Sequence, residues 1–454
     1  MSVIREELQT SRKAMSDVFA NQSLRRVFSA FSGSLIGDGV FALSAAVYAY
    51  RSGGPTSVGV LAVFRYVSIA TIAPFTSTLA DQYNRKLVMI GSDLVRLVLV
   101  ALAAVLVGLH ASKWYIYILV IAVGMAGTAF RPAQAAILPS LSREHDEVAG
   151  SNVVSSTIES VGFFAGPAIA GFLLAYSDIA TAFAFDAATF VWSALIVATI
   201  RPFSPDEQSP ELVALRSSAG SEAGASESFL KRAAEGFGVI RADRDIRTLV
   251  VLYILQCVVA GASAVFTVAV ALRLLRIGTS GLGLMESTLG IGGLIGGFIA
   301  LLLLPRARLA THFGLGVMVW SAPLLLIAAF PDLGAALLSM WLIGAANSLV
   351  DVNAITVLQH IVPNEKLGRV LGALESGEVG GMALGSLAMT LLIHAIGLRP
   401  GLTLIGGGIT VAVIPGLPAM RRIDKRALAD GVAHRLPSAH AHLHLHRHRL
   451  RHTR

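Results

Sequence analysis

The chain has 454 residues, of which 54% are hydrophobic and 14% are charged, and its mean hydropathy is +0.70. Soluble domains carry about 25% charged residues, so this composition excludes a large soluble protein and indicates a polytopic membrane protein. The net charge is +8, but the segment from Arg421 onward, with nine bases and two acids, carries +7 of it. A basicity confined to one tail favours anionic lipid headgroups as its partner, and we expect no nucleic acid.

Twelve stretches are long and apolar enough to cross a bilayer, which takes roughly 20 residues. They are Val27–Tyr50, Ser57–Ala80, Leu87–Leu109, Trp114–Leu138, Ala149–Tyr176, Ile179–Ile200, Leu249–Ala271, Gly281–Leu304, Phe313–Phe330, Leu333–Ile361, Leu367–Ile396 and Leu398–Met420. The sequence therefore predicts an all-α membrane protein of twelve transmembrane helices.

The distribution of basic residues predicts the orientation. With the N-terminus inside, the inner segments hold 28 Lys or Arg residues and the outer loops hold 5. This bias places both termini in the cytoplasm. The first 26 residues are polar, so we expect no cleavable signal peptide and a multi-pass protein of the inner (plasma) membrane.

The longest polar stretch, Arg201 to Arg247, divides the helices six plus six. We therefore expect five units: residues 1–26, a cytoplasmic segment; 27–200, an N-terminal six-helix bundle; 201–248, a cytoplasmic linker; 249–420, a C-terminal six-helix bundle; and 421–454, a basic His/Arg-rich tail.

The second part of the linker, Ser228 to Arg247, carries apolar residues at near-helical spacing among bases. This pattern predicts an amphipathic helix. Two placements fit equally well: the inner membrane surface, or a position packed on the cytoplasmic loops.

A short polar loop joins the second and third apolar stretches, in the sequence STLADQYNRKLVM from Ser77 to Met89. It resembles the signature loop between helices 2 and 3 of the major facilitator superfamily, with Ser77 and Asn84 at positions where glycine is usual. The resemblance implies two six-helix bundles around a midplane cavity lined by helices 1, 4, 7 and 10. It also implies a cytoplasmic latch between the bundles, for which the candidates are Asp81, Arg85 and Arg131.

Three further stretches resemble the macrolide-efflux and enterobactin-exporter branch of that superfamily. They are Gly33–Gly39 (GSLIGDG), Phe130–Pro139 (FRPAQAAILP) and Ala184–Phe190 (AFDAATF). This resemblance implies export of a small molecule.

Ionisable residues within the apolar stretches are the candidates for coupling, because charge in hydrocarbon is costly. Asp38 and Arg65 lie at nearly the same depth on adjacent helices, about 16 Å from the inner end and about 12 Å from the outer end, which suggests an ion pair. Asp93 and Arg96 are three residues apart and can pair on one helix face. The proton or substrate coupling candidates are Asp38, Glu159, Arg65, Arg96 and Glu378.

Each buried acid has two interpretations. A carboxyl group in a low-dielectric site can load and release a proton near neutral pH, or it can be the neutralised structural partner of an arginine or a backbone group. Asp93, Asp186 and Glu286 favour the structural interpretation, and both remain open for Asp38, Glu159 and Glu378. The second half adds cavity candidates of polar character: Gln256, Asn347, Asp351 and Asn353.

The tail alternates histidine with arginine between His440 and His452. Such a pattern can bind soft divalent metals, but a basic tail on anionic headgroups is the simpler interpretation, and we expect no metal or cofactor. The sequence contains no phosphate-binding loop of the Gly-x-x-x-x-Gly-Lys-Ser/Thr type, so we do not expect an enzyme.

Together these features predict a secondary active transporter that exports a small amphipathic molecule (drug, macrolide or siderophore type) in exchange for protons, as a monomer. Two alternatives remain: an uptake permease of the same fold, and a non-transporting membrane sensor or assembly partner. The sequence does not give the substrate.

Overall fold

The computed structural model describes residues 18–142, 145–201, 229–303 and 308–435. All regular elements in these ranges are helices. They are α2 (Gln22–Gln82), α3 (Arg85–Gly108), α4 (Lys113–Gly127), α5 (Phe130–Leu141), α6 (His145–Tyr176), α7 (Ile179–Ala198), α9 (Phe229–Ala242), α10 (Arg244–Ala269), η2 (Val270–Leu274), α11 (Gly278–Leu303), α12 (Leu309–Ser321), α13 (Pro323–Ala329), α14 (Leu333–Ile361), α15 (Asn364–Ala395), α16 (Leu398–Val413), η4 (Ile414–Gly416) and α17 (Leu417–Arg435).

The first two predicted spans lie in one element, α2, that is interrupted at Gly53 and Gly54. Gly54 has a φ of 67°, a conformation that glycine adopts without the Cβ penalty of other residues. The described residues contain eleven helices apolar and long enough to cross a membrane, and the first of these, Gln22–Ala73, covers two spans. The predicted all-helical membrane fold is therefore confirmed.

Prolines explain where other spans are divided. The fourth span is split into α4 and α5, and Pro132 lies four residues after Thr128, whose carbonyl it cannot bond. The ninth span divides where Pro323 begins α13, a position that tolerates proline because its N–H has no helical partner. The twelfth span passes through a short 3₁₀ turn at Ile414–Gly416, which contains Pro415.

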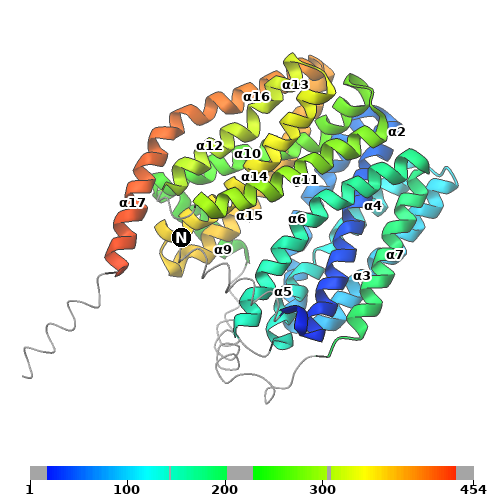
Figure 1. The fold of residues 1–454 in the computed structure, drawn as a ribbon, viewed down its shortest axis with the longest axis horizontal. Helices are drawn as coiled ribbons and strands as arrows, with labels where there is room; N and C mark the ends of the chain where they lie inside the picture. Colours follow the sequence, from blue (N-terminus) through cyan, green and yellow to red (C-terminus); the bar gives the residue numbers. More distant parts are fainter. Residues whose placement is uncertain (1–17, 143–144, 202–228, 304–307, 436–454) are drawn as a thin grey trace, which may run out of the picture.

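The helices form two halves, which Figure 1 shows as α2 to α7 on one side and α10 to α17 on the other. In the first half, α2 packs against α6 and α7, and α3 packs against α7 and α4. In the second half, α14 packs against α11 and α12, and α10 packs against α15. Buried apolar side chains from both halves form one continuous core, and a smaller core lies at the inner end of the first half.

Contacts between the halves come mainly from three helix pairs, α6 with α11, α2 with α15 and α2 with α10. Gly171 of α6 faces Gly283 of α11, and the Thr279 hydroxyl donates to the Leu174 carbonyl at 3.1 Å. In the second pair, Gly59 of α2 lies against Thr390 of α15. All these residues lie near the helix ends that the charge distribution assigns to the outer side.

The predicted amphipathic helix exists as α9, and it packs against α15 and α10. Gly236 of α9 approaches the Arg369 backbone so closely that a Cβ would lie 2.1 Å from its carbonyl oxygen. Ile240 is buried in the core. The helix thus docks on two helices of the second half.

The C-terminal helix α17 extends well beyond Met420, the predicted end of the twelfth span, and ends at Arg435. Arg422 and Arg426 of α17 bind Asp245 and Asp243 at the start of α10, at 2.7 and 2.8 Å. These ion pairs fix α17 to the inner end of α10. The histidine-rich residues 436–454 lie outside the described ranges.

Candidate functional site

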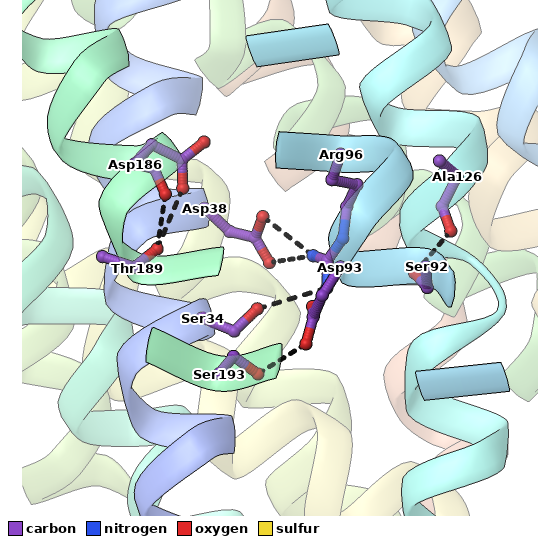
Figure 2. A network of polar contacts seen from close by, with 9 residues as sticks. All are labelled: Ser34, Asp38, Ser92, Asp93, Arg96, Ala126, Asp186, Thr189 and Ser193. Carbon is purple, nitrogen blue, oxygen red and sulfur yellow. Dashed lines mark hydrogen bonds and ion pairs between the residues drawn. The ribbon is translucent and has the colours of Figure 1, made fainter. Parts of the chain in front are cut away.

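The guanidinium of Arg96 is the centre of a polar network inside the first half (Figure 2). Its Nη1 donates to both carboxylate oxygens of Asp38 on α2, at 3.2 and 3.1 Å. Its Nη2 donates to Asp93 Oδ1 at 2.6 Å and to the Ser34 hydroxyl at 3.3 Å. One cation from α3 therefore joins two carboxylates from two helices.

Aromatic rings and a serine hold this centre in place. The Arg96 guanidinium lies 4.2 Å from the ring centroid of Phe190 on α7 and 5.1 Å from that of Phe130 on α5. A guanidinium over an aromatic face gains cation–π attraction, which is larger in a desolvated site. The Ser193 hydroxyl of α7 donates to Asp93 Oδ2 at 2.6 Å. Both oxygens of Asp93 are thus occupied.

The members of the network differ sharply in exposure. The side chains of Arg96 and Asp93 are 3% and 0% exposed, whereas that of Asp38 is 42% exposed. Asp38 lies in the middle of a membrane-spanning helix, and its carboxylate is the accessible member of a network whose other two ion-paired members are buried.

The predicted ion pair between Asp93 and Arg96 is confirmed, but the one between Asp38 and Arg65 is wrong. Asp38 pairs with Arg96, and Arg65 packs beside Gly124 of α4. The spacing along a helix gives the depth of a residue, whereas the rotation of the helix decides which neighbour it faces.

Asp186 of α7 adds a third carboxyl group beside this network. Its Oδ1 accepts from the Thr189 hydroxyl at 3.3 Å, and this oxygen lies only 2.4 Å from where a Cβ on Gly37 would be. The side chain is 0% exposed, and its Oδ2 has no hydrogen-bond partner among the described residues.

Two of the residues proposed for the cytoplasmic latch, Arg131 and Arg85, have partners within the first half. Arg131 of α5 forms an ion pair with Glu159 of α6, and its side chain is 63% exposed. Arg85 donates from Nη1 to the Ala136 carbonyl of α5 at 2.9 Å. The side chain of Asp81 lies outside the part that the structure describes.

A second polar network crosses the other half, from α12 to α15. The Gln256 amide and the Trp320 indole both donate to Asn347 Oδ1 at 3.0 Å, and Asn347 Nδ2 donates to Asp351 at 3.0 Å. The Tyr253 hydroxyl lies 3.4 Å from Asp351 and 3.4 Å from Glu378. Three cavity candidates and one coupling candidate are thereby brought together.

Two members of this network were missed from the sequence, and one candidate lies apart from it. Tyr253 precedes Gln256 by three residues on α10, so the helical period was the signal for it. Trp320 lies in an apolar run that gives no such signal. Asn353 donates to the Leu349 carbonyl of its own helix at 2.7 Å and is buried.

The halves differ in the charge of their spanning segments. Within the first half, the acids Asp38, Asp93, Glu159 and Asp186 are accompanied by Arg65, Arg96 and Arg131. In the second half, Glu286, Asp351, Glu375 and Glu378 have no basic residue beside them in the middle of the described spans. Among the described residues no group of three or more His, Cys, Asp or Glu could hold a metal ion.

A family model described as Major Facilitator Superfamily matches residues 27–330. The chain belongs to the major facilitator superfamily. It is therefore a multi-pass secondary transporter for a small molecule, not an enzyme, and membership in this superfamily does not support the sensor or assembly-partner alternative.

Within the superfamily, an uncharacterized transporter of Bacillus subtilis, YfiS, is 25% identical over 360 residues, which are 76% of this chain and 79% of YfiS. Among solved structures, a mutant of the nucleoside transporter NupG aligns with a TM-score of 0.69 at 12% identity, covering 87% of this chain and 98% of NupG. A bacterial homologue of the lysosomal transporter Spinster aligns at 0.64 and 15% identity, covering 92% and 95%. At such identities these structures show the fold alone.

Proposed function

We propose that this protein is a proton-coupled exporter of a small amphipathic molecule, acting at the plasma membrane by alternating access. The single observation that carries the proposal is Asp38, a carboxylate at mid-membrane that is 42% exposed and bound to a buried arginine. An ionised group in that position is energetically costly, and such groups are usually kept for a function. A carboxylate open to solvent can exchange a proton.

Contacts between the halves support an inward-open state. The glycine pair Gly171 and Gly283 and the contact of Gly59 with Thr390 all lie near the outer ends. At the inner side, Arg131 is 63% exposed. Figure 1 shows the halves diverging toward α5 and α17. Alternating access requires that such contacts open while others form at the inner side.

Each of the four spans that the superfamily resemblance assigns to the cavity carries a polar or charged residue. Asp38 lies on the first span, Arg131 on the fourth, Gln256 on the seventh, and Asn347 and Asp351 on the tenth. One half presents an arginine that is already bound, and the other presents acids with no basic residue beside them in the middle of the described spans. This arrangement favours an amphipathic substrate that carries polar groups.

The direction of transport is supported by sequence resemblance. The stretches Gly33–Gly39, Phe130–Pro139 and Ala184–Phe190 resemble the macrolide-efflux and enterobactin-exporter branch. The structural relatives include a nucleoside transporter and a POT family transporter in complex with 5-aminolevulinic acid. These likenesses show the fold alone, and an uptake permease of the same fold is the alternative that the experiment must separate.

The latch is a further part of the proposal. Arg85 is already bound to α5 in this inward-open state, and Arg131 to Glu159. We expect Asp81 to meet the start of α15 when the inner side closes, because the N-terminus of a helix attracts an anion.

Inverted vesicles test the proposal. A proton gradient is imposed, a panel of dyes, macrolides and siderophores is added, and gradient collapse is followed for the native protein, Asp38→Asn and Glu159→Gln. Asp178→Asn is the matched control: it removes an acid outside the networks, and asparagine caps a helix as well as aspartate does.

Collapse in the native protein and in the control, but not in Asp38→Asn, supports antiport through Asp38. Equal collapse in all four proteins refutes the choice of acids. If no compound collapses the gradient and one accumulates in right-side-out vesicles, the protein is an uptake permease and the proposal is wrong.

A further inference from the structure

The network around Arg96 contains one cation and three carboxyl groups, on three helices (Figure 2). Two carboxyls, those of Asp38 and Asp93, bind the guanidinium, and that of Asp186 does not. The charges therefore do not balance if all three acids are ionised. Which of them neutralises Arg96 can be read from their geometry.

Asp93 is the buried and fully hydrogen-bonded partner of Arg96. Its side chain is 0% exposed, and one oxygen accepts from Arg96 at 2.6 Å and the other from Ser193 at 2.6 Å. A buried ion pair persists only with good geometry and further hydrogen bonds, and removal of one partner is strongly destabilising. Asp93 meets these conditions, and so it remains ionised with Arg96.

Asp38 is the exposed partner of Arg96. Its contacts to Arg96 are longer, 3.1 and 3.2 Å, and its side chain is 42% exposed. If Asp38 takes up a proton, Arg96 keeps Asp93, so no buried charge is left uncompensated. The network can therefore gain or lose one charge at Asp38 without losing its structure.

Other charged or titratable groups face Asp38 from the surrounding helices. They are Asp93 and Arg96 of α3, Arg65 of α2 itself, Arg131 of α5 with its partner Glu159 of α6, and Asp186 of α7. Arg65 and Arg131 attract the Asp38 carboxylate but form no ion pair with it among the described contacts, so Arg96 remains the group that holds it.

Asp186 completes the assignment as a neutral acid. An ionised carboxylate without a cation in a site of 0% exposure would cost several kcal/mol, and one of its oxygens has no partner in the described part of the chain. A protonated carboxyl group avoids that cost.

We propose that Asp93, held by Ser193, is the fixed counterion that positions Arg96, and that this leaves Asp38 as the one exchangeable charge of the network. Asp93 is a positioning residue, because it acts through Arg96. The proposal rests on Asp38 as the coupling acid of the proposed function, but it can be tested without any substrate.

The test is infrared spectroscopy of the purified protein in proteoliposomes, titrated from pH 9 to pH 4. A carboxylic C=O band that appears on acidification and is absent in Asp38→Asn reports the protonation of Asp38. In Asp93→Asn, Arg96 has Asp38 as its only counterion. The pH at which the same band reaches half its amplitude should therefore be lower by at least about one unit. Ser193→Ala should shift it less in the same direction.

The double variant Asp93→Asn/Arg96→Gln removes both charges, so the pH at which the band reaches half its amplitude should return to that of the native protein. A purely structural role of Asp93 does not predict this rescue, and thermal unfolding verifies that each variant is folded. Asp186→Asn should leave the Asp38 band unchanged and remove a second C=O band that is constant over the titration.

The proposal is overturned if the Asp38 band titrates identically in native protein and Asp93→Asn, if the double variant behaves like Asp93→Asn, or if no Asp38 band appears between pH 9 and pH 4. Absence of substrate flux with a normal Asp38 band refutes the proposed function instead, so the two failures are distinguishable.

Discussion

Gly171 of α6 lies against Gly283 of α11, and a Cβ on Gly283 would come within 2.6 Å of the Gly171 Cα. No real side chain fits at that distance without displacement of a backbone. Since these helices belong to different halves, the pair sets how closely the halves approach on their outer side. Small residues at such crossings allow close packing in lipid.

The first prediction follows from this contact. Gly283→Val should hold the outer ends apart, so transport of any substrate should fall about tenfold or more, which corresponds to about 1.4 kcal/mol, while labelling of an engineered outer cysteine near Gly59 should increase. Gly91→Val is the control, because nothing lies within 4 Å of a Cβ at Gly91. Unchanged labelling in Gly283→Val would show that the outer contact does not depend on this pair.

The second prediction concerns the tyrosine between two acids. Tyr253→Phe removes the hydroxyl that lies 3.4 Å from both Asp351 and Glu378. A hydrogen bond contributes about 1 kcal/mol net, so the free energy of unfolding should fall by about that amount and proton-driven transport should weaken. Tyr115→Phe is the matched control, since Tyr115 is 61% exposed. Equal melting temperatures and transport rates in both variants would contradict a role for the hydroxyl.

The third prediction is a pH dependence at the inner end of α10. Burial opposes the ionisation of Asp243, but the hydrogen bonds from Arg426 and from the backbone N–H groups of Asp245 and Ile246 outweigh it and hold the pKa of Asp243 below its usual value. A lowered pKa in the folded state means that the stabilisation is complete above the unfolded pKa, about 3.9, and is lost as the pH falls through the lower value.

The contact between α10 and α17 should therefore be constant from pH 5 to pH 8 and should weaken below about pH 4. Hydrogen exchange of α17 measures it. In Asp243→Asn the cap of α10 is kept but the ion pair is lost. Hydrogen exchange of α17 should therefore be faster at pH 7 and should change less as the pH is lowered. An acid dependence equal to that of the native protein would rule out Asp243 as its cause.

The fourth prediction uses two glycines of α9 that differ only in their surroundings. A Cβ at Gly236 would lie 2.1 Å from the Arg369 carbonyl oxygen, whereas one at Gly238 meets nothing within 4 Å. Gly236→Leu should therefore detach α9 from α15 and speed proteolysis of the linker several-fold, and Gly238→Leu should not. Equal cleavage rates in the two variants would show that α9 does not depend on this contact.

The apolar stretches predict most of the fold because hydrophobic length is what a bilayer demands of a spanning helix. The tenth span, Leu333–Ile361, has the same ends in the structure. The division of spans at Pro132 and Pro323 was also readable in principle, since proline cannot bond its preceding turn. The extension of α17 to Arg435 was not, because polar residues there are held by ion pairs to a helix distant in sequence.

The candidate site was predicted in part. Asp93 and Arg96 were paired correctly because both lie on one helix, where spacing decides contact. Asp38 was assigned to Arg65 instead of Arg96, because contacts between helices depend on rotation and tilt. The polar residues of the second half, Gln256, Asn347 and Asp351, were chosen for their chemistry alone, and the structure brings them together.

The ties of α9 to α15 and of α17 to α10 have a consequence for how the polypeptide can be divided. Both attach segments outside the spans to the second half, so the boundary between the two halves lies before Phe229 rather than at the first residue of the seventh span. A protein made as two separate polypeptides should reassemble best when the second begins with α9 and keeps α17 complete. A fragment that begins at Leu249 would lose Asp243 and Asp245, and with them the anchor of its own last helix.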